Sequence, residues 1–125
     1  MNDLKSVRVL LVEDQMIVAL QIEDMLRAFG CEVVGPAGTL QAAITLAREE
    51  AFDVAILDIN LDGEKVYPTA EELQARGIPI ILASGYGEST LPEKWRDQPR
   101  LIKPFRRQQL EQLLTSVICR SRCRS

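Results

Sequence analysis

Short, nearly continuous apolar runs recur along the chain and are separated by stretches with helical periodicity. An apolar run that does not alternate with polar residues is typical of a strand covered on both faces of a sheet. We therefore predict five strands, at residues 7–12, 31–35, 53–58, 78–84 and 100–103.

The first helical stretch covers residues 16–29. It carries a broad apolar face through Ile17, Leu20, Met25 and Phe29. Gly30 follows directly, and we expect it to end the helix as a C-terminal cap.

Further helices are predicted between the later runs. Thr39 is suited to cap a helix over residues 40–50. Residues 67–77 have proline near their start and glycine at their end, as a helix often does. The last helix begins near Pro104, and its apolar face has helical spacing: Leu110, Leu113, Leu114, Val117 and Ile118. Two glycines and two prolines in residues 85–99 allow only a short or irregular helix there.

Strands that alternate with helices favour an α/β fold, a doubly wound parallel sheet with helices on both faces. The 125 residues fit one domain, which we assign to residues 1–120, followed by a basic C-terminal tail over 121–125.

Charge and composition argue against several classes of protein. The net charge is −3 and the pI about 5.0, which disfavours direct binding of nucleic acid. No apolar run approaches the roughly 20 residues that span a bilayer, so we expect no membrane insertion and a cytoplasmic location. The odd cysteine count and the lack of histidine favour free thiols at Cys31, Cys119 and Cys123.

Polar residues whose side chains can take part in catalysis or ligand binding follow four of the predicted strands. They are Glu13 with Asp14, then Asp58, Ser84 and Lys103. In a doubly wound sheet the carboxyl ends of the strands meet at one rim, where ligands bind. Each residue alone has an ordinary explanation: Asp14 as a helix cap, Asp58 and Ser84 as loop or turn residues, Lys103 as a solvated side chain. Together they indicate a site.

Three carboxylates at one rim require positive charge. Two carboxylates about 4 Å apart repel by roughly 4 kcal/mol at an effective dielectric near 20. Lys103 supplies one charge, and Mg²⁺ or Mn²⁺ would supply the rest, because such ions suit oxygen ligands and phosphate. We expect a phosphoryl site in which Asp58 is the nucleophile and Ser84 and Lys103 donate to phosphoryl oxygens.

The whole chain resembles the response-regulator receiver domain, the phospho-acceptor half of two-component signalling. The motifs that carry the resemblance are "LLVEDQ", "AILDINL", "ILASGYG" and "LIKPF". It implies a flavodoxin-like strand order 2-1-3-4-5. It also implies Asp58 as phospho-acceptor, Ser84 as switch hydroxyl, Lys103 as partner of the acyl phosphate, and a cis peptide before Pro104. The implied metal ligands are Glu13, Asp14, Asp58 and the backbone carbonyl of Asn60.

The sequence departs from the common receiver pattern near the switch. "ILASGYG" is closest to the motif of the FATGUY-type subfamily. Arg100 stands where most receivers have Tyr or Phe, so the usual aromatic switch is missing. We hypothesise that Tyr86, two residues beyond Ser84, takes over part of the switching or shields the phosphoryl group.

The expected function is a single-domain response regulator, because the chain ends with its last predicted helix. It would receive phosphate from a histidine kinase or histidine phosphotransfer protein and act through contacts with an unknown downstream protein. It would catalyse only its own phosphorylation and dephosphorylation, so we do not class it as an enzyme. One alternative is a haloacid-dehalogenase-type phosphatase, which normally needs a second Asp where this chain has Asn60. The other is a phosphate-independent binding module, against which the intact set of site residues argues.

Overall fold

The structure, a computed structural model, describes residues 4–85 and 91–122 of the chain. Five strands form one parallel sheet in the order β2-β1-β3-β6-β7. Their bounds are β1 (Arg8–Val12), β2 (Glu32–Ala37), β3 (Val54–Asp58), β6 (Ile80–Gly85) and β7 (Arg100–Lys103). Counting these five strands along the chain gives the order 2-1-3-4-5, so the predicted sheet is confirmed.

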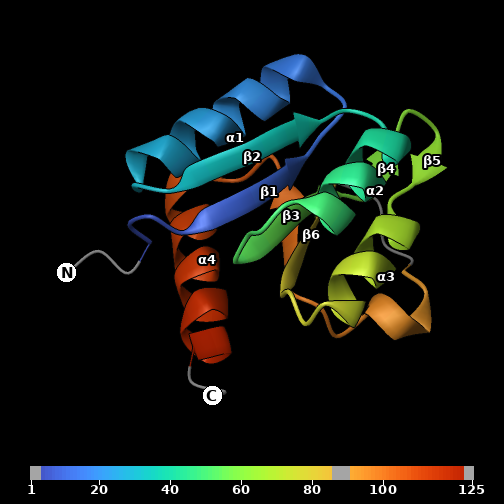
Figure 1. Cartoon of the computed structure of the whole chain (residues 1–125). Helices are drawn as coiled ribbons and strands as arrows, with labels where there is room; N and C mark the ends of the chain where they lie inside the picture. Colours follow the sequence, from blue (N-terminus) through green and yellow to red (C-terminus); the bar gives the residue numbers. More distant parts are fainter. Residues whose placement is uncertain (1–3, 86–90, 123–125) are drawn as a thin grey trace.

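Helices cover both faces of this sheet, as predicted (Figure 1). The helices α1 (Met16–Ala28) and α4 (Arg107–Arg122) pack on one face, and α2 (Leu40–Glu49) and α3 (Tyr67–Ala75) pack on the other. Between β6 and β7, the described residues contain only the 3₁₀ helix η1 (Glu93–Trp95), which agrees with a short fourth helix. Across the described ranges, no helix is long and apolar enough to cross a membrane.

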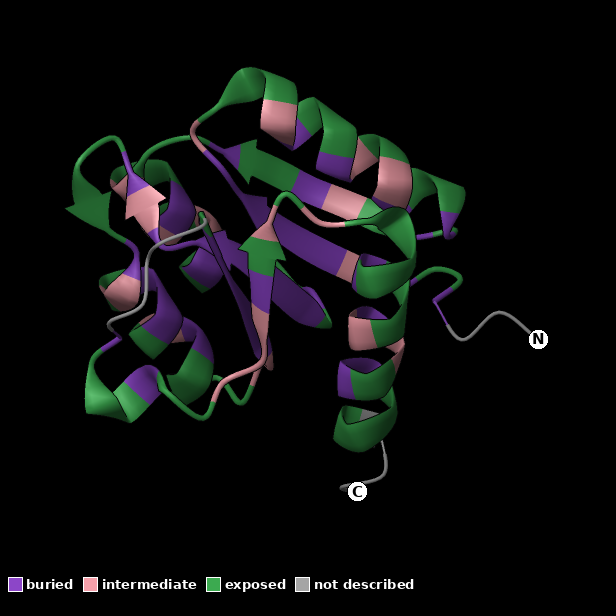
Figure 2. Ribbon diagram, turned by 180° about the vertical axis from the view of Figure 1, so that it is seen from behind, coloured by how far each residue is buried: buried purple, intermediate pink, exposed green. Residues whose placement is uncertain are grey.

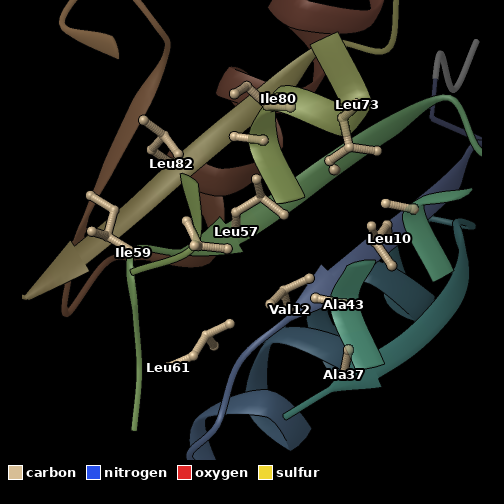
Figure 3. Close-up of a cluster of buried hydrophobic side chains, with 14 of the residues drawn as sticks. Leu10, Val12, Ala37, Ala43, Leu57, Ile59, Leu61, Leu73, Ile80 and Leu82 are labelled. Carbon is tan, nitrogen blue, oxygen red and sulfur yellow. The ribbon is translucent and has the colours of Figure 1, made fainter. Parts of the chain in front are cut away.

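A layer of apolar side chains fills the space between the sheet and each pair of helices. On the side of α2 and α3, Leu10, Leu57 and Leu82 from three adjacent strands face Ala43 and Leu73 from the helices (Figure 3). Every residue of β3 is buried. Because burial of one such side chain stabilises the fold by roughly 1.5–3 kcal/mol, these layers hold the strands in place against the helices.

The apolar face of α1 differs from the prediction at two positions. Ile17 is 74% exposed and Leu20 is 52% exposed, although both were assigned to the apolar face. The buried residues of α1 are Ala19, Ile22 and Leu26. This set follows the i, i+3, i+7 spacing of a helix face, whereas Ile17 and Leu20 point away from that face. Gly30 has φ 92°, a conformation that suits a glycine directly after a helix.

The starts of two helices are fixed by side-chain caps. The Thr39 hydroxyl accepts a hydrogen bond from the Ala42 N–H at 3.1 Å, as predicted for an N-cap. The last helix, α4, begins at Arg107 rather than near Pro104. The Gln109 side chain accepts the Arg106 N–H at 2.7 Å, which caps the helix start at Arg106.

Residues 60–65, which lie between the predicted strand at 53–58 and the predicted helix at 67–77, form a hairpin. The strands β4 (Asn60–Leu61) and β5 (Glu64–Lys65) pair antiparallel. Asp62 and Gly63 join them with φ values of 50° and 89°. Two consecutive residues with positive φ are typical of the type I′ turn that Asp-Gly favours in hairpins. Sequence patterns predicted no strand here because two-residue strands are too short to show a periodicity.

The cysteines agree with the prediction of free thiols as far as the structure describes them. Cys31 is buried and Cys119 is exposed, and neither is in a disulfide. Burial raises the pKa of the Cys31 thiol to about 11. Cys123 lies outside the described residues.

Candidate functional site

Three carboxylates meet at the carboxyl end of the sheet. Glu13 and Asp14 follow β1, and Asp58 ends β3, which is the neighbour of β1. One carboxylate oxygen from each lies within 4.8 Å of the other two. Glu13 and Asp58 are buried, and Asp14 is partly exposed. The rule that strand ends converge therefore placed these residues correctly.

Lys103 joins two of the acids from the end of β7. Its Nζ lies 2.8 Å from Glu13 Oε1 and 3.1 Å from Asp58 Oδ2. The lysine side chain is largely buried with its partners. The peptide bond between Lys103 and Pro104 is cis in the structure. One ammonium thus faces three carboxylates.

The excess of acid changes the ionisation of the site. Burial, reinforced by the hydrogen bond and charge of Glu13, raises the pKa of Asp58 to about 7, although Lys103 opposes the rise. Burial alone would lower the pKa of Lys103, but the hydrogen bond to Glu13 and the charges of both acids outweigh it, and that pKa is raised. The site therefore favours additional positive charge.

The oxygen donors suit a divalent cation. Hard ions such as Mg²⁺ are bound by carboxylate and carbonyl oxygens, and Glu13, Asp14 and Asp58 bring such oxygens together. Because Lys103 leaves part of their negative charge uncompensated, the residues fit a metal ion. Asn60 lies in the wall of the same cleft, and its backbone carbonyl as a ligand stays a prediction.

Backbone amides orient the carboxylates. The Asp62 N–H donates to Asp14 Oδ2 at 2.8 Å, the Gln15 N–H donates to Glu13 Oε2 at 3.2 Å, and the Asn60 N–H donates to Asp58 Oδ1 at 3.4 Å. Asp14 does not cap α1: Gln15 is the N-cap residue and makes no side-chain cap bond. Sequence reasoning missed the Asp62 contact because every residue other than proline has an N–H.

A cleft of about 660 Å³ opens over the acid cluster. The hairpin that follows β3, helix α1 and the segment after β7 form its walls. Asp58 and Lys103 give it a polar side, and Val18, Met25 and Phe105 give it an apolar side. The cleft can therefore admit a small anionic group next to Asp58.

Ser84 and Arg100 form a separate contact beside this cluster. Ser84 is buried on β6 and follows Ala83, the residue paired with Asp58. The Nε atom of Arg100, on β7, donates to Ser84 Oγ at 3.3 Å. This contact was not predicted. Tyr86, the other proposed switch residue, lies outside the described residues.

The sequence matches one known protein family. A family model described as the response regulator receiver domain matches residues 9–115. Among curated relatives, the transcriptional regulatory protein PdtaR of Mycobacterium tuberculosis is 33% identical over 102 residues, which cover 78% of this chain. The chain spans about half of the length of that relative, whose matched part is 50% of its sequence.

Solved structures agree with this match. The solution structure of SdrG from Sphingomonas melonis Fr1 superposes with a TM-score of 0.81 at 35% identity, and the match covers 90% of this chain and 97% of that one. The receiver domain of the sensor histidine kinase PA1611 from Pseudomonas aeruginosa has a TM-score of 0.77 at 26% identity, with 91% and 98% covered. That structure holds a magnesium ion in its active-site cleft.

Proposed function

The chain belongs to the response regulator receiver domain family, and on that premise we propose that Asp58 accepts a phosphoryl group from a phosphohistidine. The donor would be a histidine kinase or a histidine phosphotransfer protein, and the reaction would depend on Mg²⁺ or Mn²⁺. Receiver domains are phospho-acceptor signalling domains of two-component systems rather than classical enzymes.

The observation that carries this proposal is the position of Lys103. Its ammonium contacts Glu13 and Asp58 at once, on the floor of a cleft that opens to solvent. A lysine used only to neutralise the acids would need no adjoining cleft. Here it lies within reach of any group that becomes attached to the Asp58 carboxylate.

The arrangement supports an in-line displacement on phosphorus. A carboxylate oxygen of Asp58 forms the new P–O bond while the P–N bond of the phosphohistidine breaks, and the electron pair of that bond returns to the imidazole. Lys103 and Ser84 donate to phosphoryl oxygens as charge is redistributed. A bound Mg²⁺ would neutralise charge on those oxygens. Glu13, Asp14, Asp58 and the Asn60 carbonyl would hold it.

Magnesium is favoured by two observations: the chemistry of the donor atoms and the similarity to a solved receiver domain. The donor set consists of oxygen atoms, and the PA1611 receiver domain, a structural relative of this chain, has a magnesium ion coordinated in its active-site cleft.

An exposed apolar surface on α1 is suited to the phosphodonor. Met16 and Ile17 are 76% and 74% exposed at the start of α1, and Leu20 is exposed one turn later. The same helix lines the cleft through Val18. We propose that this surface, Met16, Ile17 and Leu20, contacts the helical protein that carries the phosphohistidine.

The output is proposed to be contact with a downstream protein. The "ILASGYG" stretch supports placement in the FATGUY-type subfamily. Arg100 in place of an aromatic residue supports a switch that differs from the common one.

A phosphatase of the haloacid-dehalogenase type has less support. Its general acid would stand at position 60, where the Asn60 side chain instead accepts a hydrogen bond from Lys65 Nζ at 2.6 Å. An amide cannot protonate a leaving group.

The proposal is tested by incubating the protein with Mg²⁺ and acetyl phosphate and weighing the intact protein. We expect one added phosphoryl group on the wild type and none on Asp58→Asn. Asp97→Asn is the matched control, because Asp97 is an exposed aspartate that lines a different groove, near Gly77 and Pro99. Labelling that persists in Asp58→Asn would refute the assignment. Steady turnover of p-nitrophenyl phosphate would favour the phosphatase.

A further inference from the structure

Arg100 reaches diagonally across the edge of the sheet to Ser84. In the strand register Arg100 is level with Leu82, so its side chain extends two residues toward the carboxyl ends, where the acid cluster lies. Ser84 is 1% exposed, and Arg100 is half-buried. Ser84 follows directly after Ala83, the partner of Asp58 in the register. The contact therefore links the edge strand to the immediate surroundings of Asp58.

The direction of this hydrogen bond follows from chemistry. A guanidinium has five N–H donors and no acceptor, so Ser84 Oγ must accept. The hydroxyl proton of Ser84 then remains available to a second group. A phosphoryl group on Asp58 would bring acceptor oxygens to this position. When one hydroxyl both accepts from a cation and donates to an anion, each bond polarises and strengthens the other.

We propose that Arg100 is a positioning residue for the phosphorylated state: it orients the Ser84 hydroxyl toward the phosphoryl group on Asp58. The inference deepens the proposed function and rests on it. The link Arg100–Ser84–phosphoryl group is polar throughout, and it takes the place of the aromatic side chain that most receivers have at this position of the last strand.

The same link brings the state of Asp58 to the surface of the protein. Within the described residues, strand β7 pairs with β6 alone in the sheet, and it has one buried, one exposed and two half-buried residues (Figure 2). Ile102, two residues beyond Arg100, is 51% exposed. A change in the Ser84–Arg100 bond therefore acts on a strand that a downstream protein can contact directly.

A double-mutant cycle tests the inference, with Mg²⁺ and beryllofluoride as a mimic of the phosphoryl group. The affinity for beryllofluoride is measured by calorimetry for wild type, Arg100→Met, Ser84→Ala and the double variant. We expect each single substitution to weaken binding about three- to tenfold. The affinity of the double variant should be no lower than that of the single variant with the lower affinity, because both substitutions break the same link. The inference would be overturned if Arg100→Met left the affinity for beryllofluoride unchanged. It would also be overturned if Arg100→Met lowered that affinity by the same factor in the Ser84→Ala background as in wild type.

A conservative variant separates positioning from general damage. In a Ser84→Thr background the hydroxyl is kept, so Arg100→Met should weaken binding again by a similar factor. Arg48→Met removes an exposed arginine that pairs with Glu72, and it controls for the loss of one positive charge. Thermal unfolding without ligand checks that every variant is folded.

Failure of this inference differs from failure of the proposed function. If wild type fails to bind beryllofluoride and Asp58 is not labelled by acetyl phosphate, both fall. If binding depends on Asp58 while Arg100 and Ser84 act independently, only the role of Arg100 falls.

Discussion

Asp58 and Glu13 are buried side by side and share one ammonium, that of Lys103. A carboxylate placed in this way is held in position by hydrogen bonds but lacks full charge compensation. Either a proton or a bound cation can compensate the remaining charge, so cation binding at this site would favour the ionised form of Asp58.

The pH dependence of the free energy of unfolding should reveal the raised pKa of Asp58. The folded state raises the pKa of Asp58 from 3.8 to about 7, so the folded protein binds more protons than the unfolded chain between these values. Stability from this group is therefore highest at low pH and falls as pH rises toward 7. Without metal, wild type should lose about 1–3 kcal/mol more than Asp58→Asn between pH 4 and pH 7, since one pKa unit is worth about 1.4 kcal/mol.

Urea unfolding in a chelator at several pH values measures this difference. Acids remote from Asp58 are common to the two proteins and cancel in the comparison. Parallel stability profiles for wild type and Asp58→Asn would show that Asp58 ionises normally in the folded protein.

Among the elements outside the five-stranded sheet, the hairpin β4–β5 and helix α1 both contribute to the surroundings of the site. The hairpin supplies the Asp62 N–H to Asp14, and α1 supplies the exposed surface of Met16, Ile17 and Leu20. A backbone N–H and exposed apolar side chains are not groups that sequence motifs for phosphoryl transfer contain. The elements therefore shape a site whose reactive residues come from the strand ends.

Substitution of Gly63 should weaken metal binding through the hairpin. Gly63 has φ 89°, and no atom lies within 4 Å of an added Cβ, so Gly63→Ala strains the backbone without a clash. We expect a loss of stability of about 1 kcal/mol and a severalfold weaker affinity for Mg²⁺, because the Asp62 N–H moves away from Asp14.

Gly77 provides the matched control. It has φ 74° and equally open space around an added Cβ, but it lies after α3, away from the acids. Gly77→Ala should lower stability to a similar degree and leave the Mg²⁺ affinity, measured by calorimetry, unchanged. Equal metal affinity in both variants would rule out the role of the hairpin.

Substitution on α1 should affect protein donors alone. Ile17→Ser removes exposed apolar area from the proposed contact with the phosphodonor, so transfer from a phosphorylated histidine phosphotransfer protein should slow about tenfold, which corresponds to about 1.4 kcal/mol. Labelling by acetyl phosphate, which needs no docking surface, should stay at the wild-type rate. A serine at Ile102, an exposed isoleucine on β7, is the control. Equal slowing with both donors would contradict a docking role.

The elements that sequence patterns located well are those with strong burial. All five strands of the sheet coincided with apolar runs, because a strand covered on both faces has few polar positions. The face of α1 was less certain: it holds more apolar residues than it can bury, and Ile17 and Leu20 are left exposed. The hairpin at Asp62 and Gly63 was missed, since two-residue strands carry no periodicity.

The sequence predicted those contacts of the candidate site that depend only on which residue follows each strand of the parallel sheet. Glu13, Asp58 and Lys103 came together because they end neighbouring or nearby strands. The bond between Arg100 and Ser84 depends on the register between β6 and β7, which sequence patterns do not give. The use of a main-chain amide to hold a carboxylate is likewise independent of residue type.

At the scale of the whole molecule, two apolar layers hold a sheet whose carboxyl end carries unbalanced negative charge. The apolar layers stabilise the fold, and the uncompensated negative charge of the three acids at the carboxyl end of the sheet favours binding of a cation. Because the acids belong to the folded state, a cation bound there stabilises the whole protein.

Added Mg²⁺ should therefore raise the midpoint of thermal unfolding at pH 8. At a concentration one hundred times the Kd, the gain is about 2.7 kcal/mol for one site. Asp14→Asn should lose most of this gain, whereas Asp97→Asn should keep it. The shift is followed by scanning calorimetry against NaCl of equal ionic strength. A gain that Asp14→Asn retains in full would place the cation elsewhere.

The identity of the phosphorylated residue tests the account most directly. After incubation with acetyl phosphate and Mg²⁺, borohydride reduces an aspartyl phosphate to homoserine, and peptide mass spectrometry then locates it. We predict homoserine at position 58 and at no other aspartate. Homoserine at Asp14 or Asp62, or its absence from position 58 in protein that carries a phosphoryl group, would contradict it.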